Sequence, residues 1–110
     1  MILSVVRELT TSATPAEVLH AVDGQIGHTE RVHTEEHRTS AGTMTIAVYE
    51  QYFARVKNRI ALMILADDFK GPTGVRIIAT GASQGMIFNL DWGAAGAYAS
   101  EAEHIIRQLS

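Results

Sequence analysis

The segment Ile60 to Ala66 (IALMILA), apolar at every position, constrains the fold of this chain more than any other. Successive side chains of a strand point to opposite faces, so such a run predicts a strand at the centre of a sheet with both faces covered. Turn residues lie on both sides of the run, at Lys57-Asn58 and at Lys70-Gly71-Pro72-Thr73-Gly74. They predict tight connections to neighbouring strands, and therefore an antiparallel sheet.

Further segments, rich in β-branched residues or alternating in polarity, predict the other strands: 2–9, 29–39, 43–56 and 75–80, with room for a short one at 86–90. In the longest of them Met44, Ile46 and Val48 share one face. The segment 29–39 is polar and predicts an edge or solvent-facing strand. We therefore expect five or six strands in one sheet.

Two segments predict amphipathic helices. Thr14-Pro15-Ala16-Glu17 combines a capping threonine, a proline suited to the first helical position and a glutamate that completes a capping box. An apolar stripe follows at helical spacing, and Gly27 indicates that this helix ends near residue 25 or 26. A second stripe predicts a C-terminal helix, with Asp91 as its candidate cap: Tyr98, Ala102, Ile105, Ile106 and Leu109.

The resulting order, β-α-β-β-β-β-α with room for one more strand before the last helix, predicts a single α+β domain over residues 1–110. Each helix needs one apolar surface, and one face of an antiparallel sheet supplies it to both. The same order occurs in TATA-binding-protein-like and helix-grip folds, in which a curved sheet wraps a long C-terminal helix. We expect that architecture, with both helices on one face of the sheet.

The second face of the sheet has no helix to cover it in this architecture. Its central strand then carries Ala61, Met63 and Leu65, or their alternates, and monomers seldom expose a large contiguous apolar patch. A homodimer formed through this face would remove the patch from water. The alternative is that long side chains of the same chain cover it, among them Arg59, Arg76 and Tyr52.

The composition excludes several classes of function. Nine Lys and Arg are scattered among twelve acids, for a net charge of −3, so the chain lacks the basic surface that grips nucleic-acid phosphates. It has no cysteine, which excludes disulfides, thiolate nucleophiles and iron–sulfur clusters. The N-terminal segment is too short and too soon charged for a signal peptide or a membrane span. We therefore expect a cytoplasmic protein without a cofactor.

His33-Thr34-Glu35-Glu36-His37 is the cluster most suggestive of chemistry. On a strand, His33, Glu35 and His37 project from one face, and imidazole together with carboxylate can bind a zinc-like ion. Same-face residues are about 6.5–7 Å apart along a strand, so two adjacent ligands converge on one ion more readily than all three. The alternative is a polar edge strand whose charges discourage aggregation.

Candidate ligand-binding residues are Tyr49, on the long strand, and Ser83 and Gln84, in the small-residue loop Gly81 to Gly85. The loop amides could form an anion nest, although such a loop more often marks a bend or bulge, and an aromatic residue on a strand is more often core. No catalytic residue is predicted. Adjacent carboxylates at 67 and 68 point to opposite faces of a strand, and no serine lies in a G-x-S-x-G elbow.

The segment 80–93 (TGASQGMIFNLDWG) resembles a family of small bacterial proteins of unknown function and of about this length. Members carry a similar Gly-small-Ser-Gln-small-apolar-Phe stretch before a C-terminal helix, and a strand like Val48-Tyr49-Glu50-Gln51-Tyr52. The resemblance spans nearly the whole chain, with Gly81 to Phe88 as its distinctive motif, but Ala94-Ala95-Gly96 stands where acidic helix starters are usual. It implies no activity, ligand or catalytic residue.

These observations favour a non-enzymatic, homo-oligomeric binding or interaction module, because acid, base and nucleophile do not converge in the sequence. Its expected partners are a second copy of the chain and a small-molecule ligand, and neither nucleic acid nor membrane. The alternative is a metal-binding protein or metal-dependent enzyme that uses His33, Glu35 and His37.

Overall fold

The computed structural model describes residues 2–27, 29–54, 57–82 and 92–109. Over these residues the chain forms the elements in the predicted order: β1 (Ile2–Thr11), α1 (Pro15–Gln25), β2 (Glu30–Thr39), β3 (Gly42–Phe53), β4 (Asn58–Asp67), β5 (Thr73–Ala82) and α2 (Trp92–Arg107). The short apolar run at 86–90, which left room for a further strand, lies outside the described residues.

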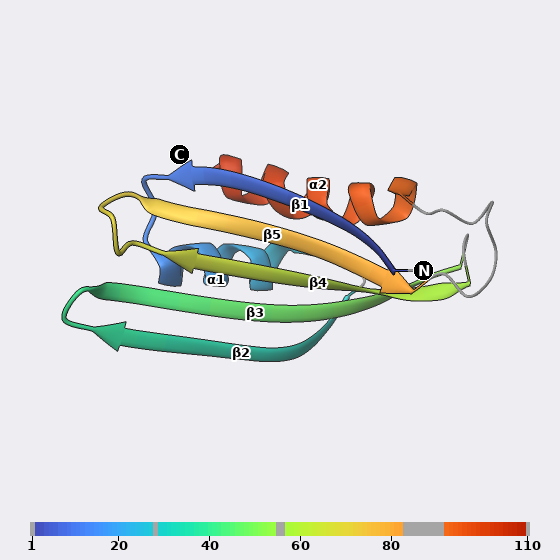
Figure 1. Ribbon diagram of the computed structural model, residues 1–110, viewed down its shortest axis with the longest axis horizontal. Helices are drawn as coiled ribbons and strands as arrows, with labels where there is room; N and C mark the ends of the chain where they lie inside the picture. Colours follow the sequence, from blue (N-terminus) through green and yellow to red (C-terminus); the bar gives the residue numbers. More distant parts are fainter. Residues whose placement is uncertain (1, 28, 55–56, 83–91, 110) are drawn as a thin grey trace.

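The five strands form one antiparallel sheet in the order β1-β5-β4-β3-β2 (Figure 1). β4 holds the central position, as its apolar run predicts, and Ile64 lies opposite Ile77 of β5 and Ala47 of β3. The polar β2 lies at one edge, which confirms the edge strand expected at 29–39. A bulge between Arg31 and His33 interrupts its pairing with β3.

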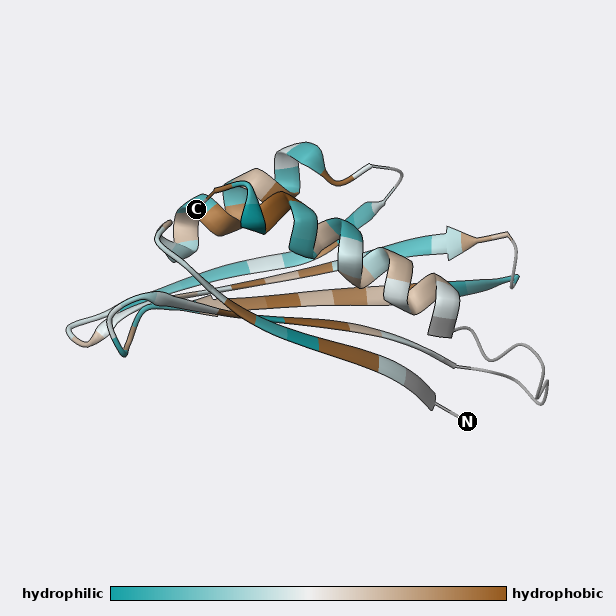
Figure 2. Ribbon diagram, turned by 90° about the horizontal axis from the view of Figure 1, so that it is seen from above, coloured by the Kyte–Doolittle hydropathy of each residue, from teal (hydrophilic) through white to brown (hydrophobic). Residues whose placement is uncertain are grey.

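Both helices pack on the same face of the sheet, which we call the inner face (Figure 2). α2 lies over β1 and β5, and α1 over β3 and β4. The inner-face side chains of the central strand are buried beneath them: Ile60, Leu62, Ile64 and Ala66. The predicted α+β fold with two helices on one face of a single sheet is confirmed.

Alanines bring α2 close to the sheet. Ala94, Ala95 and Ala99 are buried, and their short side chains let the helix axis approach the strands. The predicted apolar stripe of this helix is confirmed, since four of its members are buried: Tyr98, Ala102, Ile105 and Ile106. The candidate cap Asp91 lies outside the described residues. Within the described part of the chain, no helix has the length and apolarity that crossing a membrane requires.

Local hydrogen bonds fix the start of α1 over the sheet. The predicted capping box is present: the Thr14 hydroxyl accepts the Glu17 N–H at 3.1 Å, and the Glu17 carboxylate accepts the Thr14 N–H at 2.8 Å. The helix ends at Gln25, within the predicted range. Its first turn is tied to β3 by the Thr45 hydroxyl, which donates to the Pro15 carbonyl at 3.0 Å.

Candidate functional site

The face of the sheet turned away from the helices, which we call the outer face, carries a row of apolar side chains. Val6 of β1 lies opposite Ile78 of β5, which lies opposite Met63 of β4, which lies opposite Val48 of β3. Met63 is 37% exposed and Val6 54% exposed. We call these four residues the apolar row. The expected apolar second face is therefore present, and it extends over four of the five strands.

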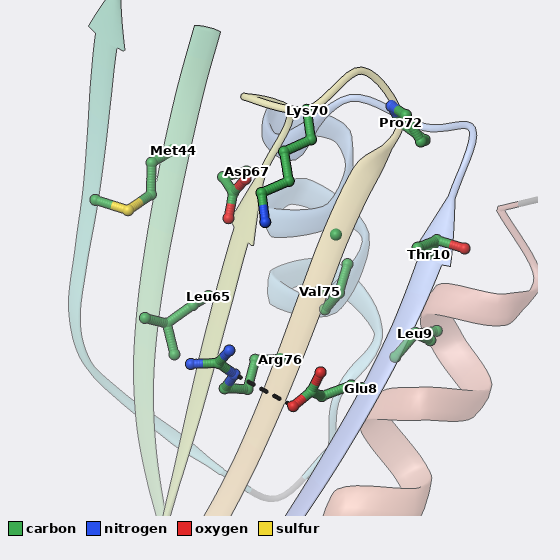
Figure 3. A pocket seen from close by; sticks show the side chains of 11 residues that line it. Glu8, Leu9, Thr10, Met44, Leu65, Asp67, Lys70, Pro72, Val75 and Arg76 are labelled. Carbon is green, nitrogen blue, oxygen red and sulfur yellow. Dashed lines mark ion pairs between the residues drawn. The ribbon is translucent and has the colours of Figure 1, made fainter. Parts of the chain in front are cut away.

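Two of the long side chains expected as an alternative cover for this face, Arg59 and Arg76, form ion pairs on it beside the apolar row. Arg59 pairs with Glu50 at 2.7 Å and with Glu30 at 2.9 Å, and these carboxylates raise the pKa of its guanidinium. Tyr52 is itself 54% exposed. Arg76 turns toward Glu8, with 3.8 Å between nitrogen and oxygen (Figure 3). The charged groups of Arg59 and Arg76 therefore lie beside the apolar row, and Met63 stays exposed to solvent.

His33, Glu35 and His37 also lie on the outer face, at its β2 edge, opposite Val48, Ile46 and Met44. Nε2 of His33 lies 2.9 Å from one carboxylate oxygen of Glu35, and Nε2 of His37 lies 2.9 Å from the other. The hydrogen bonds from His37 and His33 lower the pKa of Glu35 below its ordinary value. The strand period thus brings the three candidate ligands together on one side.

Both imidazoles of this cluster are directed at the carboxylate between them and not at a shared point in solvent. Among the residues that the structure describes, no three His, Asp or Glu side chains are grouped as a metal ion would require. Metal binding here would therefore need the histidines to turn away from Glu35. All three side chains are well exposed, which leaves them free to do so.

Of the candidate ligand residues, Tyr49 lies within the described part of the chain. Tyr49 is buried on the inner face, where its hydroxyl donates to Asp23 of α1 at 3.2 Å. Burial and the nearby Asp23 carboxylate raise the pKa of this tyrosine. Ser83 and Gln84 lie outside the described residues. Tyr49 thus joins α1 to the sheet.

A hollow of about 520 Å³ opens near the β4–β5 turn, and the sequence reasoning did not find it (Figure 3). Its walls include Met44, Leu65, Asp67 and Lys70, and Gly74 lies among them. The sequence of residues 70–74 predicts only a turn, yet Gly74 lies inside β5 and pairs with residues on both sides. A glycine within a strand was the available signal, because it often marks a place where another group approaches the backbone.

Comparisons with known proteins show the fold and the family. The chain is similar to protein MLL2253 from Mesorhizobium loti, with 12% identity, a TM-score of 0.57, and 98% of this chain and 99% of that one covered. It is also similar to Ara h 8.0201, with 11% identity, a TM-score of 0.50, and 97% and 99% of the chains covered. At such identities these likenesses show a helix-grip fold alone. No curated protein matches the sequence. A family model matches residues 6–110, and the chain therefore belongs to the family of unknown function DUF6054.

Proposed function

We propose that this protein is a non-enzymatic interaction module that forms a homodimer through the outer face of its sheet. The observation that carries this proposal is the apolar row, which runs without interruption from β1 to β3, while both helices of the described residues pack on the other face. Leu65 of β4 and Ile46 of β3 lie opposite each other beside it and widen the apolar area. Apolar patches of this kind on soluble proteins mark interaction sites.

The size of the outer face suits one partner. Strands spaced about 4.8 Å apart and rising about 3.3 Å per residue give a five-stranded, ten-residue face of roughly 800 Å². That is close to the ~800 Å² that each partner contributes to a standard protein interface. An apolar centre with charged residues at its edges is also the usual composition of such an interface.

The charges around the apolar row favour a second copy of this chain as the partner. Glu8 and Arg76 lie toward the β1 edge, and Glu35 lies between two histidines at the β2 edge. Both signs are therefore present at the rim. A self-complementary interface needs this mixture, because the same patch must face itself across a two-fold axis.

The carboxylates that were considered for acid–base chemistry have structural partners, which supports a function without catalysis. Asp68 accepts the backbone N–H of Thr43 at 2.7 Å and so closes the turn beside β3. Asp67 accepts the N–H of Phe69 at 3.4 Å. These contacts are typical of aspartates at turns.

Light scattering on the purified chain tests the dimer. We expect twice the chain mass of 12.0 kDa for the wild type. Met63→Lys places a charge in the middle of the apolar row and should give the single chain mass. Val6→Lys, on the edge strand, should do the same with less risk to the fold, because Val6 is 54% exposed.

The matched control is Ala97→Lys, which adds the same charge to an exposed position of α2. It should leave the doubled mass unchanged. Circular dichroism should give the wild-type spectrum for every variant that is compared. A wild-type chain that stays monomeric at high concentration contradicts the proposal, as does a folded Val6→Lys variant that keeps the doubled mass.

A metal site at His33, Glu35 and His37 is the second candidate function. Two imidazole nitrogens lie within 2.9 Å of one carboxylate on an exposed strand, and these are donor groups that zinc accepts. Titration of zinc followed by calorimetry should show one ion per chain, and His33→Ala combined with His37→Ala should abolish this uptake.

The control for the metal test is His20→Ala, because His20 is exposed on α1, away from the cluster. It should bind zinc as the wild type does. Zinc uptake that survives the double substitution, or no uptake by the wild type, would rule out this second function without affecting the proposed dimer.

A further inference from the structure

The hollow on the outer face exists because one side chain is missing from a row. Gly74 lies opposite Thr10 of β1 and Asp67 of β4, and Asp67 lies opposite Met44 of β3. A Cβ added at Gly74 would meet no heavy atom within 4 Å. The φ angle of Gly74 is not positive, so the backbone here does not require glycine. The glycine therefore leaves open a space that a larger residue could fill.

The walls of this hollow combine apolar surface with charges of both signs (Figure 3). Met44 and Leu65 form the wall on the β3 and β4 side. At the turn, Lys70 reaches back over the sheet beside Asp67, and at the opposite end lie Arg76 and Glu8. Two cations and two carboxylates thus surround an apolar wall, and the charges sum to zero.

The cations of the hollow keep most of their hydrogen-bonding capacity. Lys70 makes no hydrogen bond or ion pair with any residue that the structure describes. Within the same residues, Arg76 pairs with Glu8 alone, and their separation of 3.8 Å is too long for a hydrogen bond. An arginine has five N–H donors, so Arg76 can donate hydrogen bonds to a further carboxylate.

We propose that this hollow binds a small zwitterion with an apolar side group, the chemistry of a free apolar amino acid. Arg76, at one end of the hollow, takes its carboxylate, and Asp67, at the other end, takes its ammonium. The apolar side group lies on Met44 and Leu65. A simple anion fits less well, because the two carboxylates of the hollow repel it while the two cations attract it. The volume of about 520 Å³ is within the range of small-molecule sites.

Three probes of matched shape separate these alternatives: L-leucine, 4-methylpentanoate, which lacks the ammonium group, and 3-methylbutylamine, which lacks the carboxylate. Calorimetry with the full chain at neutral pH should show saturable binding of leucine. Each analogue should bind at least about tenfold more weakly, because each loses a set of charge-assisted hydrogen bonds. The proposal fails if leucine does not bind, or if either analogue binds as tightly as leucine.

Substitutions locate the binding. Gly74→Val places a side chain in the hollow, at a position where a Cβ meets no heavy atom within 4 Å, and Arg76→Gln removes a cation; each should weaken leucine binding at least about tenfold. Gly24→Ala, at another glycine with open space around it, and Arg38→Gln, at an exposed arginine of β2, should bind leucine normally. Leucine binding that is unchanged in Gly74→Val would place the ligand elsewhere and overturn the proposal.

One chain supplies every group of this hollow, so a monomer can bind the ligand, although Glu8, Leu65 and Arg76 also lie on the face proposed for the dimer. Light scattering on Gly74→Val tests the dimer separately from leucine binding. If the wild type is monomeric and still binds leucine, the dimer fails and the ligand site stands. If Gly74→Val has the same doubled mass as the wild type and no longer binds leucine, both stand.

Discussion

At the scale of single residues, Glu35 lies on the outer face between two histidines of its own strand. His37 and His33 each donate to one of its oxygens at 2.9 Å, and these hydrogen bonds hold the pKa of Glu35 below its ordinary value of 4.5. A carboxyl group whose pKa is lowered by folding stabilises the folded state above its unfolded pKa. That stabilisation is lost as the pH falls through the lowered pKa of the folded state.

The prediction that follows concerns the titration of Glu35. Carbon NMR of its carboxyl group should give a midpoint below 4.5 in the wild type, and His33→Ala with His37→Ala should raise this midpoint toward 4.5. Glu17 is the internal control, because its pKa is lowered by hydrogen bonds with Thr14 and not by histidine. Its midpoint should not move. A Glu35 that titrates at the same pH in both proteins would show that the two histidines do not stabilise the carboxylate.

At the scale of the elements, sequence patterns with a local cause are the ones that predicted the structure. The capping box at Thr14 and Glu17 lies within one turn of chain, and it forms as expected. The apolar run from Ile60 to Ala66 predicted the central position of β4, which is confirmed, but only its inner-face side chains are buried and Met63 on the outer face is exposed. The alternation in β3 likewise predicted that Met44, Ile46 and Val48 share one face, and they lie together on the outer face.

What the sequence could not predict depends on pairing between distant segments. β1 extends past the expected residue 9 to Thr11, because Thr10 and Thr11 pair with Gly74 and Thr73 of β5. Arg7 faces the helices and pairs with Glu103 of α2 at 3.4 Å, across 96 residues of sequence. The hollow around Gly74 could not be predicted for the same reason, because residues of four strands and one turn line it. The residue pattern of a single segment does not show which distant segments it will contact.

At the scale of the whole molecule, two helices and one sheet leave an imbalance. Both helices of the described residues pack on the inner face, so the apolar row of the outer face stays in contact with water. Sheets in sandwiches resolve this imbalance by packing a second sheet about 10 Å away. A homodimer through the outer face would supply that second sheet from another copy of the chain.

The coupling between this proposed dimer and folding leads to a last prediction, on thermal stability. If the native state is a dimer and the unfolded state a monomer, mass action makes the melting temperature rise with protein concentration. A tenfold rise in concentration is worth about 1.4 kcal/mol, which for two chains of this size raises Tm by roughly 3–6 °C. Calorimetry of the wild type and of Ala97→Lys at several concentrations should show this rise, and Val6→Lys should melt lower and at one temperature throughout. A wild-type Tm that is constant over a hundredfold range of concentration would mean that the apolar row stays in water, and that the chain tolerates it as a folded monomer.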